Sequence, residues 1–227
     1  MWKNAQDVVR DFVFGMQDGL VSNLGLVLGV WQGGGGQFAI LLAGFASMFT
    51  GAFSMSAGSY LSAKSQREVY EQEIASTRER LENNPQQCLN EMKKILHQEG
   101  LGKSEITTLF KKSSKYQHPE FVCNYMVHKK VGISKEKFDI PLRNALTMFF
   151  SFLAGSIVPL FPFLLFPNGV AAVTATLLTI VALFFIGWAK TYYTKLNWIK
   201  SGLEIVLVGV GAGMIGYLVG RVLGALG

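Results

Sequence analysis

Five long apolar runs, each about the length of a membrane-spanning helix, divide the 227-residue chain. A helix crosses the hydrocarbon layer of a bilayer in roughly 20 mostly apolar residues. Runs of that length occupy residues 11–32, 37–62, 143–166, 170–190 and 201–226. The pattern predicts an all-α membrane protein with five transmembrane helices.

Short turn sequences join these runs in two pairs. Gly33–Gly36 separates the first two runs, and Pro167–Gly169 separates the third from the fourth. Both are typical of tight turns, so we expect two antiparallel helix pairs. In the third run, Pro159 and Pro162 should break or kink the helix. Small residues spaced four apart in the fifth run indicate close helix packing: Gly209, Gly213, Gly216 and Gly220.

A polar insert, residues 64–142, lies between the second and third runs. Residues 64–83 contain no Gly or Pro, so they should continue the preceding membrane helix without a break. Asn84 and Pro85 predict the start of the next helix, with Asn84 as the N-cap and Gln87 completing a capping box. Later Gly and Pro residues predict two more short helices and thus a small helical bundle. The expected domains are residues 1–63, 64–142 and 143–227.

The distribution of charge gives the expected orientation in the membrane. Only 16% of the residues are charged and 50% are hydrophobic, which disfavours a globule surrounded by water. All 21 Lys and Arg residues except Arg221 lie in the N-terminal tail, in or beside the insert, or before the fifth run. By the positive-inside rule the N-terminus and the insert are cytoplasmic, and the C-terminus lies on the opposite side. The net charge of +6 therefore indicates topology and contact with lipid headgroups, and does not indicate nucleic-acid binding.

Acidic residues within apolar runs are candidates for function, because a charge at the centre of a bilayer costs about 3 kcal/mol on insertion scales. Asp18 lies in the first run, with Ser22 on the same helix face and Asn23 nearby as further oxygen donors. Glu204 lies at the start of the fifth run, where an interfacial carboxylate close to water is an equally good interpretation. Met55 of the second run adds a thioether, although by periodicity alone it is more often a packing or lipid-facing residue. One carboxylate with one thioether suits a borderline divalent cation such as ferrous iron better than calcium or magnesium.

Four segments together resemble the vacuolar iron transporter family: Asp18–Ser22, Gly51–Gln66, Gly155–Pro162 and Ser201–Glu204. The resemblance covers nearly the whole chain, including the insert. It implies a homodimer of five-helix subunits that exports ferrous iron, sometimes manganese, from the cytosol in exchange for protons. It also implies that Asp18 and Met55 line the translocation path at the dimer interface. The metal is then the cargo, and no resident cofactor is expected.

The membrane helices depart from the family pattern at one position. The best-known branch carries a glutamate linked to proton coupling in the second helix, and this chain has Ser47 there. The role of proton coupling then falls to Asp18, to Glu204 or to no residue. The sequence is consistent with transport either with or without proton antiport.

The insert departs from the pattern more widely. In the same branch it collects metal with glutamates and methionines, and among the matching positions only Glu91 and Met126 keep the expected residue type. Cys88 can substitute as a thiolate ligand three residues before Glu91, and Glu79 with Glu82 can serve in a shifted register. The alternative interpretation of this acidic run is a solvated helix with ion pairs three and four residues apart.

Two classes of function follow from these observations. The first is a transporter of a divalent transition metal, with ferrous iron ahead of manganese. The second is a membrane protein that binds or senses metal without transporting it, or that docks a partner through the basic insert. An enzyme is disfavoured, since the sequence has no P-loop and no visible pair of nucleophile and base.

Overall fold

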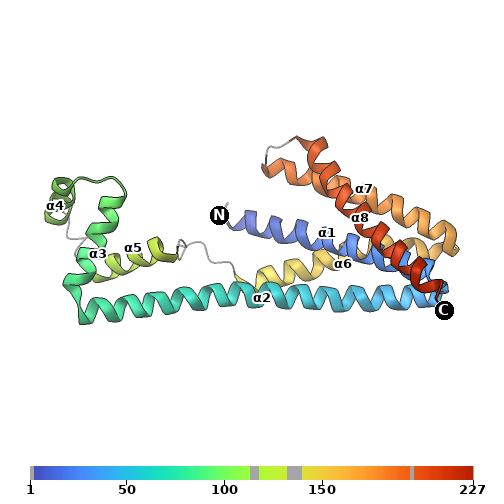
Figure 1. Cartoon of the computed structure of the whole chain (residues 1–227), viewed down its shortest axis with the longest axis horizontal. Coiled ribbons are helices and arrows are strands. Elements are labelled where there is room, and N and C mark those ends of the chain that lie inside the picture. Colours follow the sequence, from blue (N-terminus) through green and yellow to red (C-terminus); the bar gives the residue numbers. More distant parts are fainter. Residues whose placement is uncertain (1–2, 113–117, 132–139, 195–196, 227) are drawn as a thin grey trace. The chain divides into compact units, whose positions relative to one another are not determined.

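The computed structural model describes residues 3–112, 118–131, 140–194 and 197–226. The chain divides into two compact units, one formed by residues 1–61 with 139–227 and one by residues 62–138. All regular structure among the described residues is helical (Figure 1). One long helix, α2 (Gln37–Asn83), contributes its first part to the membrane unit and its last part to the second unit.

Five helices are long and apolar enough to span a membrane, which confirms the five predicted crossings. They are α1 (Lys3–Gln32), α2, α6 (Pro141–Leu165), α7 (Asn168–Thr194) and α8 (Trp198–Gly224). Each of these helices contains one of the five apolar runs for most or all of its length. As expected, α2 continues past its apolar part into the polar segment without a break.

The turn between α1 and α2 depends on glycine. Gly34 has φ +85°, a left-handed conformation that residues with a Cβ seldom adopt. The Gly33 amide donates to the Gly29 carbonyl and the Gly35 amide to the Val30 carbonyl, both at 2.9 Å. These bonds satisfy two of the carbonyls at the end of α1 and reverse the chain over a few residues.

Helix α6 continues through its internal prolines, so of the two expected effects, a break or a kink, the break does not occur. Pro159 and Pro162 both lie inside the continuous helix and are buried. Each proline removes one backbone donor, but such losses are tolerated in membrane helices that pack against neighbouring helices. The helix ends one turn later, where the Phe166 amide donates to the Pro162 carbonyl at 2.9 Å.

Helix α1 packs backbone to backbone against α6. A Cβ placed on Gly19 would overlap the carbonyl oxygen of Phe152, and one placed on Gly155 would overlap the carbonyl oxygen of Met16. Glycine at both positions therefore lets the two helices approach more closely than side chains allow. A Cβ on Gly15 would meet Met148 and Ser151, and one on Gly19, a turn later, would meet Phe152 and Ser156. The contacts therefore advance in the same direction along both helices, so α1 and α6 run parallel.

On another side, α1 packs against α8, again backbone to backbone. A Cβ on Gly216 would overlap the Gly25 carbonyl oxygen, and one on Gly220 would overlap that of Gly29. The close packing expected from the small residues of the fifth run is confirmed at these positions. Apolar side chains fill the remaining space around α1, and Leu20 is completely buried in this core.

The second unit contains the end of α2 with α3 (Pro85–Gln98), α4 (Lys103–Lys112) and α5 (Pro119–Val131). Its apolar core includes Tyr70 of α2 and Met92 of α3. Asn84 occupies the N-cap position of α3, but its side chain makes no capping hydrogen bond, so the predicted capping box is not formed. The capping contact of this unit lies instead at α4, where the Gly102 amide donates to the Glu105 carboxylate at 2.7 Å.

The glycine contact between α1 and α8 leads to a stability prediction. We expect Gly216→Ala to lower the free energy of unfolding by about 1–3 kcal/mol, because the added methyl group meets backbone that cannot rotate away. Gly211→Ala is the matched control, since its Cβ would meet nothing within 4 Å. That change should be neutral or stabilising by about 0.5–1 kcal/mol, because alanine favours helix. Unfolding with SDS in mixed micelles measures both, and equal stabilities of the two variants would contradict the packing account.

Candidate functional site

The candidate site begins on α1, where Asp18 is half-buried within the membrane-spanning part of the helix. Ser22 lies one turn further on and is exposed, and its hydroxyl donates to the Asp18 carbonyl at 2.6 Å. This bond uses the hydroxyl proton and leaves the oxygen lone pairs available to a cation. Asp18 and Ser22 therefore present two oxygen donors on one side of α1.

Asn23 lies elsewhere on α1. It follows Asp18 by five residues, which places it roughly 140° around the helix. Its side chain is completely buried, and neither its amide oxygen nor its amide nitrogen has a hydrogen-bond partner among the described residues. Of the two neighbours considered as further ligands, the geometry favours Ser22.

Another acidic residue of α1, Asp11, was not among the candidates identified from the sequence. It is only 4% exposed, and its Oδ1 accepts hydrogen bonds from the Arg10 guanidinium at 3.1 and 3.2 Å. Because Asp11 precedes Asp18 by seven residues, the two carboxylates lie on nearly the same line along the helix. The seven-residue spacing could have identified Asp11 from the sequence. Asp11 extends the line of carboxylates toward the N-terminal end of α1.

Met55 of α2 and Asp18 of α1 both lie near residues that contact Phe152 of α6. The carbonyl oxygen of Phe152 lies beside Gly19, and its ring lies beside Gly51. Asp18 directly precedes Gly19 along α1, and Met55 is four residues, about one turn, beyond Gly51 along α2.

Met48 and Met55 lie seven residues apart on one face of α2 and differ in their surroundings. Met48 is 4% exposed and packs in the core with Leu24 and Leu160, so its thioether is a packing group. Met55 is half-buried and keeps part of its surface accessible. Ser47, which replaces the family glutamate, is also half-buried and lies two turns from Met55. Asp18 and Met55 are thus both partly accessible, and each lies within about one turn of a glycine that contacts Phe152.

Glu204 lies in the second turn of α8 and is exposed on the surface of the single subunit. The N-terminus of this helix is capped by Asn197, whose side-chain oxygen accepts from the Ile199 and Lys200 amides at 3.0 and 3.4 Å. The carboxylate lies one turn beyond the first turn of the helix, and it is in that first turn that the helix dipole would act on it most strongly. This position agrees with both interpretations, an interfacial carboxylate and a proton carrier.

The candidate ligands of the insert fall into two groups. Cys88 and Met126 are 3% and 0% exposed and belong to the same apolar core, with Glu91 half-buried on the same helix as Cys88. Glu79 and Glu82 are exposed on α2. Across the described ranges, no three or more His, Cys, Asp or Glu side chains come together as a group able to hold a metal.

Ion pairs along the polar part of α2 support the solvated-helix interpretation for its first turns. Lys64 lies 3.7 Å from Glu68, and Arg67 lies 2.7 Å from Glu71, each pair four residues apart. All four side chains are more than half exposed, so each pair contributes little to stability.

A model of the VIT family matches residues 9–221 of the chain. The chain belongs to the VIT family. Vacuolar iron transporter 1 of Arabidopsis thaliana is 29% identical over 219 residues, which cover 96% of this chain and 87% of the relative. Vacuolar iron transporter 1 of Eucalyptus grandis is 31% identical over 210 residues, covering 90% and 82% of the two chains. Protein CCC1 of Saccharomyces cerevisiae is 27% identical over 220 residues, covering 93% and 68%.

The VIT-family match extends from α1 through α8 and includes the insert. Membership of the family confirms the resemblance seen in the sequence, and two of the three relatives are named as vacuolar iron transporters, which are transporters rather than enzymes. The five apolar helices together with the match to the family identify a multi-pass integral membrane protein.

Burial of the insert cysteines leads to a labelling prediction. We expect each single-cysteine variant, Cys88→Ser or Cys123→Ser, to react with a maleimide roughly tenfold or more slowly in the native full-length protein than in SDS. The remaining thiol is 4% or 3% exposed and reacts only when the insert opens. Glu82→Cys in a chain without the two native cysteines supplies an exposed control thiol. Native labelling of Cys88 as fast as that control would contradict its placement in the core.

Proposed function

We propose that this VIT-family protein transports a divalent transition metal, ferrous iron ahead of manganese, from the cytosol to the other side of the membrane. The observation that carries the proposal is the half-buried Asp18 in a membrane-spanning helix, with Met55 of α2 about one turn from the glycine that contacts the same Phe152 as Gly19 does. The names of the relatives, vacuolar iron transporters, support the choice of metal.

The chemistry of the two side chains fits this cargo. Asp18 compensates part of the charge of a partly dehydrated cation, and the cation in turn offsets the cost of a carboxylate in a medium of low dielectric constant. Met55 supplies a soft thioether that favours ferrous iron over magnesium or calcium. Ser22 adds a neutral oxygen. Asp11, nearer the N-terminus, extends the line of oxygen donors toward the side that we assign to the cytosol.

The proposal includes a homodimer. One carboxylate and one thioether leave a divalent cation short of both charge and ligands. A second subunit related by twofold symmetry would supply another Asp18 and another Met55. Each subunit would be oriented in the membrane by the positive-inside rule, with the N-terminus and the insert in the cytosol and the C-terminus on the opposite side.

For the insert we propose that metal is gathered through Cys88, Glu91 and Met126. Two of these three side chains now lie in one apolar core, so binding requires the core to open. Ferrous iron should then slow the maleimide reaction of Cys88, with Cys123 in the complementary variant as the control. Equal labelling rates with and without iron would leave the insert as a structural unit.

A second candidate function is a membrane protein that binds or senses metal without moving it, or that docks a partner through the basic insert. The departures from the family pattern, Ser47 in place of the glutamate and the loss of most expected insert ligands, favour it. Growth rescue of a yeast strain that is sensitive to iron because it lacks vacuolar iron storage separates the two functions. Rescue supports transport, and stable expression without rescue supports sensing.

The first functional prediction concerns Asp18. In proteoliposomes, Asp18→Asn should reduce ferrous iron flux by about tenfold or more, because the amide keeps the shape of the side chain but cannot balance the charge of the cation. Glu68→Gln is the matched control, since it removes an exposed carboxylate of the polar part of α2. Size-exclusion chromatography and circular dichroism check that both variants remain folded. Iron flux in Asp18→Asn equal to that of the control would exclude the proposed site.

The second functional prediction concerns protons. If Glu204 carries them in place of the missing glutamate, vesicles that are acidic on the receiving side should take up iron faster, and Glu204→Gln should lose this acceleration. The flux without a pH gradient should stay within about twofold of wild type, because Glu204 is not among the proposed metal ligands. No acceleration in the wild-type protein would mean that iron moves without proton exchange.

A further inference from the structure

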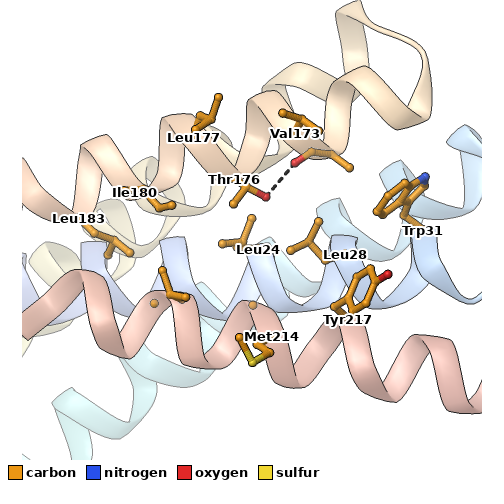
Figure 2. Close-up of a pocket in the computed structure, with 14 residues that line it drawn as sticks. Leu24, Leu28, Trp31, Val173, Thr176, Leu177, Ile180, Leu183, Met214 and Tyr217 are labelled. Carbon is orange, nitrogen blue, oxygen red and sulfur yellow. Dashed lines mark hydrogen bonds between the residues drawn. The ribbon is translucent and has the colours of Figure 1, made fainter.

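An apolar cavity of about 400 Å³ lies between α1, α7 and α8. Figure 2 shows Leu24 and Leu28 of α1 beside it, with Ile180 of α7 across from them and Met214 of α8 below. Its volume falls in the range of pockets that hold small molecules. The Asp18, Ser22 and Met55 side chains do not line it.

The wall of the cavity offers nothing to a polar ligand along most of its length. The hydroxyl of Thr176 is occupied, since it donates to the Ala172 carbonyl at 2.8 Å (dashed line in Figure 2). The outer rim is made of Val173, Leu177 and Met214, which are 59%, 58% and 58% exposed. Because all three helices span the membrane, this rim opens toward hydrocarbon, and an elongated apolar group is the ligand that fits.

One end of the cavity is different. Trp31 and Tyr217 lie together there, with ring centroids 6.5 Å apart, and Leu183 lies at the opposite end (Figure 2). Neither the indole N–H of Trp31 nor the hydroxyl of Tyr217 bonds to another described residue. Both residues lie close to the ends of their helices, at the depth where aromatic side chains meet lipid headgroups.

A cation lies one helical turn beyond this end of the cavity. Arg221 follows Tyr217 by four residues, so it lies on the same face of α8 one turn nearer the helix end. Arg221 is exposed and forms no ion pair with any residue in the described part of the chain. It is also the single Lys or Arg outside the three basic zones of the sequence. Three hydrogen-bond donors without partners thus gather where an apolar cavity meets the membrane surface.

We propose that this cavity binds one acyl chain of an anionic phospholipid from the leaflet at the C-terminal ends of α1 and α8. The acyl chain would lie along the apolar wall between Leu183 and Trp31. Arg221 would pair with the phosphodiester, and the Trp31 and Tyr217 donors would reach the phosphate or the glycerol ester oxygens. Charge complementarity selects an anionic lipid as the occupant, because Arg221 is exposed and has no ion-pair partner among the described residues.

Native mass spectrometry of the full-length protein tests the proposal. The protein is delipidated in detergent and then exposed to equal amounts of dioleoyl phosphatidylglycerol and dioleoyl phosphatidylcholine. We expect one retained lipid per subunit with a preference for phosphatidylglycerol. Thr176→Phe, which places a ring in the cavity, should reduce retention of both lipids about tenfold or more. Arg221→Gln should keep retention but lower the preference for phosphatidylglycerol roughly fivefold, the contribution expected of one basic residue at a charged membrane surface.

Two matched variants make the result specific. Val181→Phe adds the same ring to a residue of α7 that is 52% exposed and lies outside the cavity, and Lys200→Gln removes an exposed cation from the other end of α8. Both should bind lipid as the wild type does. Circular dichroism and thermal unfolding show whether Thr176→Phe is folded, and Arg221→Gln changes only an exposed side chain.

Three outcomes would overturn the proposal. The first is an unchanged lipid preference in Arg221→Gln, because the headgroup contact would then be absent. The second is equal lipid loss in Thr176→Phe and Val181→Phe, because the added ring would then act without filling the cavity. The third is a loss of dimer in Thr176→Phe with lipid retention unchanged, which would assign this face to a contact between subunits.

Discussion

Direct backbone contact between α1 and two neighbouring helices fixes the membrane unit. Glycines on α6 and α8 allow carbonyl groups of α1 to approach them without intervening side chains, on two sides of the same helix. Such contacts tolerate neither rotation nor sliding, because any turn of α1 would drive side chains into backbone. The rotation of α1 therefore sets which of its residues are buried and which remain accessible. Asn23 faces the core and Ser22 faces outward for this reason.

The candidate site depends on the same constraint. Asp18 precedes Gly19, so the contact of Gly19 with α6 holds the carboxylate at a defined depth and leaves it half-buried. Helix α2 is held differently, by side chains such as the Phe152 ring on Gly51 and by the Gln37 side chain, which donates to the Phe163 carbonyl at 2.6 Å. In the membrane unit, Asp18 is thus carried by α1, which is fixed by backbone contacts. Met55 is carried by α2, which is held by side-chain contacts.

The sequence predicted the five membrane helices and the continuous α2 because hydrophobic length and the absence of Gly and Pro are local properties. It did not decide between a broken and a kinked α6, since tolerance of Pro159 depends on neighbouring helices. Asp11 was overlooked because it stands at the edge of an apolar run, where burial depends on tertiary packing. For the same reason the sequence could not indicate that Cys88 and Met126 belong to one core. A helical period places residues on a face but does not reveal what covers that face.

The balance of charge decides how far one subunit can act alone. A divalent cation beside one Asp18 keeps a net charge of about +1, which is still costly in a medium of low dielectric constant. Asp11 lies two turns away and already accepts hydrogen bonds from Arg10, so it is poorly placed to neutralise the remainder. A second Asp18 related by twofold symmetry would complete the neutralisation and would also double the thioether. Our proposal therefore requires a dimer for an electrostatic reason. One half-buried Asp18 per subunit neutralises only half of the charge of a divalent cation.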